Sequence, residues 1–359
     1  MPASESIQQA AWRRLKKNKA AVFGMLVIVL ALLLALLGYF IAPDDSPFAN
    51  RMTVEIGGKN PGYTQLFLLL KKERPPETPS FFSRLLYGRQ DNYTWLPINS
   101  FRQQGDSIIV QKFIDEGIAE RRAFASAQTA GTPVTTKKFI LGTDKYGRDI
   151  VSRLIIGTRV SLSVGLIAVI ISLSTGILLG ALAGYFGGRT DDIIMWFINV
   201  IWSIPTLLLV FAITFLLGKG FWQVFIAVGL TMWVTVARIV RGQVLAVREL
   251  EYVEAARALG YRQGRIIFRH ILPNIAGPVL VVGAANFASA IVIEAGLSFL
   301  GVGVQPPQPS WGLMIKENYN FIITHNPVLA LAPGFAIMLL VLAFNLLGNG
   351  LRDALNARA

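Results

Sequence analysis

The sequence predicts an all-α integral membrane protein with six transmembrane helices. Of its 359 residues, 53% are hydrophobic and only 15% are charged, and the mean hydropathy is +0.52. A soluble domain carries about 25% charged residues, so this chain has too few charges to cover a surface that faces water. Six apolar stretches are long enough to cross a bilayer as helices, which satisfy their own backbone hydrogen bonds in lipid.

Each of the six stretches holds about 20 or more mainly apolar residues, the length that a transmembrane helix needs. They are residues 20–42, 160–186, 193–217, 221–240, 275–300 and 328–347. The first stretch follows basic residues, as the core of a signal peptide also would. It is too long for such a core, and Ile41-Ala42-Pro43 offers no small-residue cleavage site, so we predict a retained helix.

Single residues predict how the stretches are shaped and placed. Pro205 lies in the middle of the third stretch and predicts a kink. Glycines at every fourth position of the second stretch predict close contact with another helix; they are Gly176, Gly180 and Gly184. Tryptophans near the ends of stretches predict anchors at the membrane–water interface; they are Trp12, Trp222 and Trp311.

Basic residues near the ends of the stretches predict which side each loop faces. With the N-terminus inside, the cytoplasmic segments are 1–19, 187–192, 241–274 and 348–359. They hold most of the Lys and Arg of the short loops, including Arg189, Arg352 and Arg358, whereas the short outer segments hold only Lys219 and Lys316. We therefore expect a multi-pass protein of the cytoplasmic (inner) membrane with both termini in the cytoplasm.

Segment 43–138 differs from the rest because it is polar, punctuated by prolines and mixed in charge. We expect a small folded extracytoplasmic insertion, with strands at 54–56 and 107–111; the alternative is an unstructured loop. The chain then divides into four parts. These are a cytoplasmic basic lead (1–19), a first transmembrane helix (20–42), the insertion (43–138) and a core of five transmembrane helices (139–359) with a cytoplasmic loop at 241–274.

Several function classes are excluded by residues that the chain lacks. It has no Cys and two His, His270 and His325, which argues against a metal site. It has no GxxxxGK[ST] phosphate loop, no HExxH and no plausible Ser/His/Asp arrangement. The net charge of +13 is explained by charges beside the apolar stretches, so nucleic-acid binding is not expected. We predict that the chain is not an enzyme.

Loop 241–274 has the pattern of two short helices joined by a turn. Glu249, Glu251 and Glu254 crowd the start of the first helix, where the helix dipole favours acids. Apolar residues at helical spacing predict one apolar face; they are Tyr252, Ala255, Ala256 and Leu259. Gly260 is placed to end this helix, and a basic helix over 262–270 should stop before Pro273. Such a pair can dock into a partner's groove or lie on the membrane surface.

Buried charge is expected at two further places. Glu294 is the only acid within the apolar stretches. Because a lone charge in lipid is costly, Glu294 either lines a gate or path or pairs with a donor such as Arg148 or Arg153. The charged residues before the second stretch predict an ion-paired structural corner, with direct substrate contact as the alternative; they are Asp144, Arg148, Asp149 and Arg153.

The pattern Glu254-Ala255-Ala256, Gly260 and Leu272-Pro273 resembles the EAA loop of ABC importer permeases, although His270 stands where the general pattern has Ile. Segments 141–149, 294–301 and 306–312 are similar to the second permease subunit of the dipeptide, oligopeptide and nickel branch. The resemblance covers residues 1–42 and 139–359, and segment 43–138 is enlarged relative to short members.

This resemblance implies a type I ABC importer permease fold, with Glu254, Ala255, Ala256, Gly260, Tyr252 and Leu259 docking on an ATPase. It implies a heterodimer with a second permease subunit, two ATPase subunits that carry ATP and Mg, and an extracytoplasmic substrate-binding protein. The chain itself would bind no cofactor. Peptide is the expected cargo, with nickel or an opine as the alternative. The alternative class is an ion-coupled secondary transporter, which would need polar ion sites or broken helices within the membrane. Only Glu294 and Pro205 point to such features.

Overall fold

A computed structural model describes residues 7–74, 76, 79–218, 220–324 and 326–355. Lys219, His325 and Arg358 lie outside the described residues. The chain forms two compact units. The helical unit comprises Met1–Ala31, Ser161–Gln305 and Ile337–Ala359, and the sheet unit comprises Leu32–Val160 and Pro306–Ala336.

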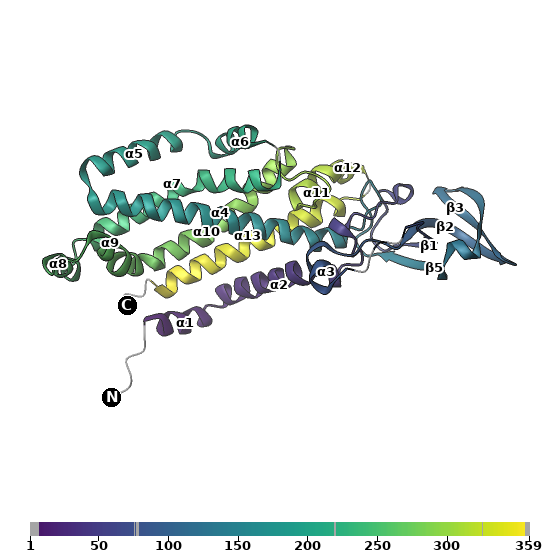
Figure 1. Ribbon diagram of the computed structural model, residues 1–359, viewed down its shortest axis with the longest axis horizontal. Coiled ribbons are helices and arrows are strands. Elements are labelled where there is room, and N and C mark those ends of the chain that lie inside the picture. The colour runs from purple at the N-terminus through teal and green to yellow at the C-terminus, as the bar shows by residue number, and fades with distance from the viewer. Residues whose placement is uncertain (1–6, 75, 77–78, 219, 325, 356–359) are drawn as a thin grey trace, which may run out of the picture. The chain divides into compact units, whose positions relative to one another are not determined.

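Long apolar helices dominate the helical unit (Figure 1). Within the described residues, five helical segments are long and apolar enough to cross a membrane, or six if one bent pair counts as a span. The elements that lie in this unit or enter it are α1 (Ile7–Lys17), α2 (Lys19–Ile41), α4 (Ile150–Phe186), α5 (Gly188–Trp202), α6 (Thr206–Leu217), α7 (Phe221–Val247), α8 (Glu251–Ala258), α9 (Gln263–Ile266), α10 (Ala276–Phe299) and α13 (Val328–Leu355). The prediction of an integral membrane protein with about six apolar helices is therefore confirmed.

The third predicted stretch is not one kinked helix but the pair α5 and α6, bent by 93°. Pro205 stands immediately before α6. It has no N–H to donate to the preceding turn, and its ring clashes with the backbone there, so the helix stops rather than bends. Helix α5 is held against α7 by Arg241, whose Nε and Nη2 donate to the Asp191 carboxylate at 2.5 and 2.6 Å.

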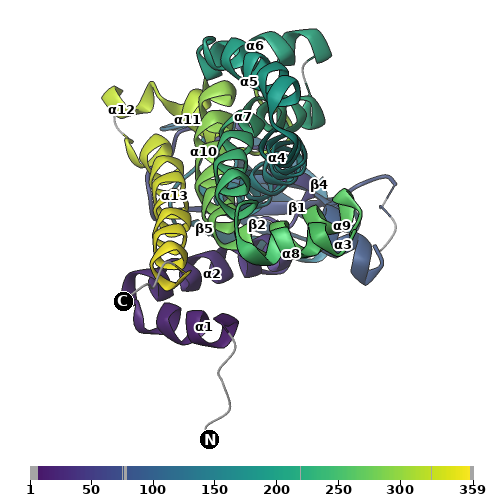
Figure 2. The ribbon, with the colours of Figure 1, turned by 90° about the vertical axis from the view of Figure 1, so that its left-hand side faces the viewer.

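The glycines of α4 bring it into close contact with α7, as their spacing predicted, and the two helices lie side by side (Figure 2). A Cβ added to Gly176 would lie 2.5 Å from Val236 Cβ, and one on Gly184 would lie 2.8 Å from Val244 Cβ. A Cβ on Gly180 would lie 2.9 Å from Val240 Cβ and closer still to the Ala237 carbonyl oxygen. Only glycine allows the two backbones to approach this closely.

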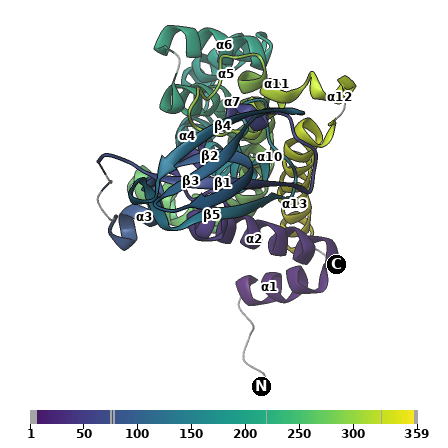
Figure 3. The same ribbon diagram turned by 90° about the vertical axis from the view of Figure 1, so that its right-hand side faces the viewer.

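The sheet unit contains a five-stranded antiparallel sheet, with strand order β4-β3-β2-β1-β5 (Figure 3). The strands are β1 (Tyr63–Lys71), β2 (Tyr93–Gln104), β3 (Ser107–Asp115), β4 (Ile118–Ala125) and β5 (Thr129–Phe139). Short helices accompany them: α3 (Phe81–Tyr87), α11 (Trp311–Asn318) and α12 (Phe321–Thr324). The all-α class therefore holds for the apolar helices and not for segment 43–138.

The strand predictions within this segment were partly right. Residues 107–111 lie in β3, whereas Val54–Ile56 form a 3-10 turn. Leu66 to Leu70, an apolar run too short to cross a membrane, forms most of β1, with side chains buried on both faces of the sheet. Leu68 packs with Ile98 and Val110 on one face, and Phe67 packs with Phe113 and Phe139 on the other.

Two of the three tryptophans predicted to lie at the membrane–water interface are exposed, and the third is buried. Trp12 and Trp222 are exposed, as interfacial anchors would be. Trp311 is buried, and its Nε1 donates to the Leu154 carbonyl at 3.0 Å. Its indole packs directly on Gly157, where a Cβ would lie 3.0 Å from the ring. The prediction of an interfacial anchor at Trp311 is therefore wrong, because glycine leaves a slot that the indole fills.

The contact between α4 and α7 predicts a sharp difference between two glycine substitutions. Gly180→Ala should destabilise the protein by about 1–3 kcal/mol, because the added methyl overpacks a closed interface. Gly242→Ala on α7 has nothing within 4 Å of its Cβ and should be neutral or slightly stabilising, since Ala favours helix over Gly. Thermal unfolding in detergent measures both, and equal midpoints would contradict the close contact.

Candidate functional site

Helix α8 ends in a complete capping motif built around Gly260. The Gly260 N–H donates to the Arg257 carbonyl at 2.9 Å, and the Tyr261 N–H donates to the Ala256 carbonyl at 3.1 Å. These two bonds define a Schellman motif, which needs a left-handed residue at the position of Gly260. Gly260 has φ +74°, so its predicted role as the helix cap is confirmed.

Helix α8 buries one face and exposes another. Val253 and Ala256 are buried. They pack with residues of α4, α7 and α9 and of the turns that lead into α10, in what we call the knuckle core; its buried members are Ala181, Tyr185, Val236, Val240, Val244, Val253, Ala256, Ile266, Ile267, Ile271, Ile275 and Val282. Tyr252, Ala255 and Leu259 point outward with Glu254, and Leu259 is 72% exposed. The predicted face of four residues is thus divided, because Ala256 turns inward and three residues stay outside.

The prediction that the second helix of loop 241–274 stops before Pro273 is wrong. Helix α9 is followed by a π-helical turn (Ile267–Ile271) and a 3-10 turn (Leu272–Ile275), which leads into α10. A proline within an α-helix crowds the carbonyl four residues earlier, and changes of helix type at this point let the chain continue past Pro273. His270 stacks on Tyr261, with ring centroids 5.9 Å apart.

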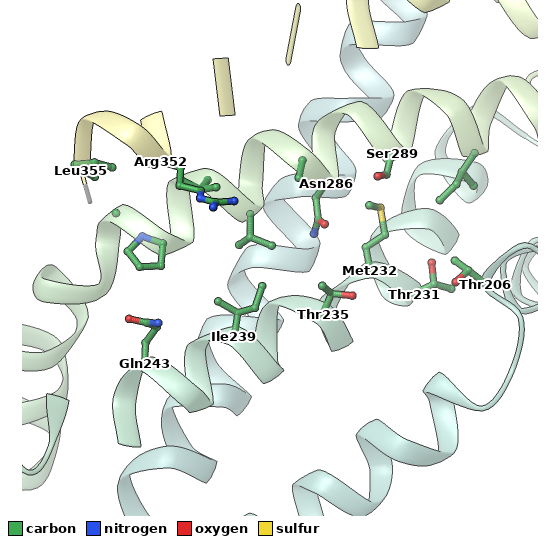
Figure 4. A pocket seen from close by; sticks show the side chains of 16 residues that line it. Thr206, Thr231, Met232, Thr235, Ile239, Gln243, Asn286, Ser289, Arg352 and Leu355 are labelled. Carbon is green, nitrogen blue, oxygen red and sulfur yellow. The ribbon is translucent and has the colours of Figure 1, made fainter. Parts of the chain in front are cut away.

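A cavity of about 800 Å³ lies between α7 and α10 (Figure 4). One edge of α7 faces it with residues four apart: Thr231, Thr235, Ile239 and Gln243. Helix α10 faces it with the same spacing: Gly277, Val281, Ala285, Ser289 and Ile293. Thr206 of α6 and Arg352 and Leu355 of α13 also line it. Among the lining residues that are described, Arg352 is the only charged one, and the polar remainder are hydroxyls and amides.

This lining was missed at the level of sequence, although a signal exists. Polar residues four apart on one apolar helix mark a face that avoids lipid. Asn286 adds to this polar face from α10, and its amide donates to Ser172 Oγ at 3.3 Å. The four-residue repeat of small or polar residues in both helices could therefore have located the cavity.

Glu294 is fully buried and lies against the turn that ends α10. The Ser298 hydroxyl donates to Glu294 Oε1 at 2.6 Å and accepts from the Val304 N–H at 3.0 Å. Gly303 packs on Ser298 so closely that a Cβ there would clash. The neighbouring Ile293 lines the cavity and Glu294 does not. Glu294 thus organises residues 300–304 through Ser298.

In the sheet unit, Arg148 and Arg153 are gathered on two carboxylates. Arg148 Nε lies 2.6 Å from Asp144 Oδ2, and its Nη2 lies 2.7 Å from Glu317 Oε2. Arg153 reaches the same two carboxylates at 3.8 and 3.5 Å. All four side chains are buried or nearly so. Glu317, on α11, was not among the predicted residues, because nothing near position 148 in the sequence points to it.

Asp149 has a different role from its neighbours. Its Oδ1 accepts from the Ser152 N–H at 2.8 Å and from the Ser152 hydroxyl at 3.0 Å. A carboxylate that accepts the N–H three residues later caps the start of a helix, here α4. The predicted corner therefore consists of an ion cluster (Asp144, Arg148, Arg153 and Glu317) and a helix cap beside it.

Asp44 is buried and Lys137 is partly buried close to this cap. Burial alone would raise the pKa of the Asp44 carboxyl, but Arg51, Lys137 and hydrogen bonds from Ser46 hold that pKa below its ordinary value. Burial lowers the pKa of the Lys137 amine, and the nearby charge of Arg51 lowers it further. The Asp44 N–H donates to Ser152 Oγ at 2.8 Å, which ties the chain after α2 to the start of α4.

Among the described residues, no three His, Cys, Asp or Glu side chains are grouped so that they could hold a metal ion. The ion cluster contains two carboxylates and two guanidinium groups, which neutralise each other.

The ion cluster predicts that Arg148 is essential for stability. Arg148→Ala leaves the Asp144 and Glu317 carboxylates buried without their closest cation, and breaking a buried pair in this way costs about 3–5 kcal/mol. Lys145→Ala is the matched control. It also removes a cation from the same segment, but the Lys145 side chain is exposed. Unfolding midpoints of the two variants in detergent should differ by many degrees; similar midpoints would refute a stabilising cluster.

The sequence matches two family models. Residues 176–359 match "Binding-protein-dependent transport system inner membrane component". Residues 6–53 match "N-terminal TM domain of oligopeptide transport permease C". The first match contains the cavity, α8 and Glu294 and covers more than half of the chain.

Relatives agree with these matches. The glutathione transport system permease protein GsiD of Pectobacterium atrosepticum is 43% identical over 218 residues, 61% of this chain and 72% of that protein. The dipeptide transport system permease proteins DppC of Bacillus subtilis and Lactococcus lactis are each 32% identical over 99% of this chain, covering 87% and 91% of those proteins. These two matches run through the sheet segment.

Among solved structures, the chain is similar to a chain of the MetNI methionine ABC transporter in an inward-facing conformation, with 18% identity, a TM-score of 0.47, and coverage of 57% of this chain and 96% of that chain. The family models and the two DppC relatives show the family. The chain belongs to the family of binding-protein-dependent transport system inner membrane components, and it is the permease subunit of an ABC importer.

Proposed function

We propose that this permease imports peptides and that α8 transmits the movement of an ATPase to the helices around the cavity. The observation that carries the proposal is the division of α8 into two faces. Val253 and Ala256 are buried in the knuckle core, while Tyr252, Ala255 and Leu259 are exposed. One face is thus joined to the transmembrane helices and the other is available to a partner.

The exposed face of α8 suits a groove on an ATPase subunit. Apolar side chains three, four and seven residues apart are the usual anchors of a helix in a groove, and Tyr252, Ala255 and Leu259 have this spacing. Glu254 adds a charge beside them. In our proposal this chain and a second permease subunit each place such a helix on one of two ATPase subunits. ATP and Mg²⁺ are bound by the ATPases, so this chain needs no cofactor.

The cavity is proposed as this subunit's part of the translocation path. Its volume of about 800 Å³ lies within the usual range for small-ligand sites, about 300–1,000 Å³. Hydroxyl and amide groups such as Thr235, Asn286 and Ser289 can exchange hydrogen bonds with a peptide backbone without holding any one side chain tightly. None of its lining residues in the described part of the chain is a His or a carboxylate, which favours peptide over nickel. The relatives named for glutathione and dipeptide transport support the same choice.

The arrangement of basic residues supports the topology that we propose. Loop 241–274 and segment 1–19 carry most of the short-loop Lys and Arg, which supports a cytoplasmic location for both of them and for the two termini. Segment 43–138 then lies outside, on the side where a substrate-binding protein would deliver peptide.

Transport in this proposal follows from the packing. When the ATPases close on ATP, they pull on α8. The knuckle core carries this displacement to α7 and α10, which line the cavity, and the path opens outward to receive peptide. Hydrolysis of ATP on the partner subunits then restores the inward-open arrangement.

The docking of α8 is tested by a substitution at its most exposed apolar residue. Leu259→Glu should weaken ATPase binding more than tenfold, because losing an anchor side chain in an interface costs about 2 kcal/mol or more. Leu259→Met keeps an apolar side chain of similar size and should bind normally. Co-purification of the ATPases with each variant measures the effect. Equal recovery from both variants would rule out docking through this face.

The role of the cavity is tested by filling it. Ser289→Phe places an aromatic ring in the cavity and should abolish peptide uptake while ATPase binding is unchanged. Val292→Phe adds the same ring to an exposed position of α10 that does not line the cavity, and should leave uptake near the wild-type rate. Peptide uptake by reconstituted transporter is the measurement. Normal uptake by Ser289→Phe would show that peptide takes another route.

A further inference from the structure

The short helix α3 exposes several large apolar side chains. Phe81, Phe82, Leu86 and Tyr87 are 65, 74, 59 and 67% exposed. The three residues between them, Ser83, Arg84 and Leu85, are partly buried. Ser80 caps the start, where its hydroxyl accepts from the Ser83 N–H at 3.3 Å, and Gly88 ends the helix. Four large apolar residues on seven positions are far more than a water-exposed helix of a stable protein normally carries.

This helix is held firmly against the end of α2. Arg159 donates to the Ala35 and Leu36 carbonyls of α2 at 2.5 and 3.0 Å, and to the Leu85 and Leu86 carbonyls of α3 at 2.7 and 3.0 Å. A cation at the last carbonyls of a helix also complements the helix dipole. Gly88 packs so closely on Tyr39 that a Cβ there would lie 2.8 Å from the ring. The exposed side of α3 is therefore a fixed surface.

The apolar surface of α3 continues that of α2. Phe81 stacks on Phe40, with ring centroids 5.6 Å apart. In the part of α2 that belongs to the sheet unit, apolar side chains are exposed along one side up to the end of the helix; they are Leu32, Leu33, Leu36, Leu37, Phe40 and Ile41. Helix α2 is long and apolar enough to cross a membrane, so α3 lies where a membrane-spanning helix leaves the hydrocarbon.

Charge around α3 matches the same location. Residues 79–89 contain Arg84 and Arg89 and no acid. The Arg84 guanidinium lies over the Phe40 ring at 4.9 Å and contacts Asp45 at 3.3 Å. A short amphipathic helix with Phe and Leu on one side and Arg on the other is typical of segments that lie in the plane of a lipid–water interface.

We propose that α3 is an interfacial anchor and that its exposed apolar side chains are covered by phospholipid. Phe81, Phe82, Leu86 and Tyr87 enter the boundary between headgroups and acyl chains, and the exposed Arg89 faces the headgroup phosphates. The anchor fixes the sheet unit to the membrane beside the end of α2. This surface is separate from the cavity and from α8.

The test measures lipid contact directly. Because the chain has no Cys, Phe82→Cys and Tyr87→Cys each allow one fluorescent label, and Gln103→Cys on the exposed end of β2 is the matched control. The assembled transporter is labelled with an environment-sensitive dye in nanodiscs of phosphatidylcholine and phosphatidylglycerol. The wild-type complex, treated in the same way, gives the background from partner subunits. The emission of each labelled variant is measured with no quencher, with spin-labelled lipid in the bilayer, and with iodide in the water.

We expect spin-labelled lipid to quench the dye at positions 82 and 87 about twofold or more, as for a helix within the interface, and to leave position 103 unquenched. Iodide should give the reverse order. Equal quenching by iodide at 82, 87 and 103 would place α3 in water and overturn the proposal. Protection of 82 and 87 from both quenchers would mean that a partner protein covers α3, which also overturns it. Neither outcome depends on transport, so the role of the cavity and of α8 is judged separately.

Discussion

The function that we propose for this permease depends on one interaction, the packing of the knuckle core. Without it, α8 would be a short helix on two connecting segments, and a force applied to it would be absorbed by the loops. Val253 and Ala256 instead lie among buried side chains of α4, α7 and α9 and of the start of α10. Because a packed interior transmits displacement rather than absorbing it, we expect α8 to move together with these helices.

Helix α7 shows how one element serves both packing and transport. Val236, Val240 and Val244 face the glycines of α4, whereas Thr231, Thr235 and Gln243 face the cavity. Both sets recur at spacings of four, on different sides of the same helix. In the mechanism that we propose, a rotation of α7 driven from α8 would change the wall of the cavity directly. The glycine contact resists separation of α4 and α7, so the two helices are expected to turn together.

The sequence predicted what depends on local chemistry and missed what depends on tertiary partners. Apolar length identified the membrane helices, glycine spacing identified the α4–α7 contact, and the left-handed cap at Gly260 followed from the residue type. Ala256 was assigned to the exposed face because periodicity alone cannot tell which half of an apolar face is covered. The sheet was largely missed because β1 is buried on both faces and lacks the alternation that marks a strand. Pro205 and Pro273 gave opposite outcomes. The helix breaks at Pro205, whereas at Pro273 π-helical and 3-10 turns lead on into α10, because the surrounding turns decide whether a chain can continue past proline.

For the ion cluster, the sequence shows that buried arginines need carboxylate partners, but only the fold shows which carboxylates they are. Arg148 and Arg153 are two cations, and buried charge must be compensated. Asp149 is occupied as a helix cap, so Asp144 alone would leave one positive charge in excess. A second carboxylate is therefore required, and the fold supplies Glu317 from a segment 169 residues away from Arg148. Glu294 in the helical unit holds the end of α10 through Ser298. An excess of buried cations over the carboxylates available nearby in the sequence thus predicts a carboxylate partner from a distant segment. The sequence does not say which residue that partner is.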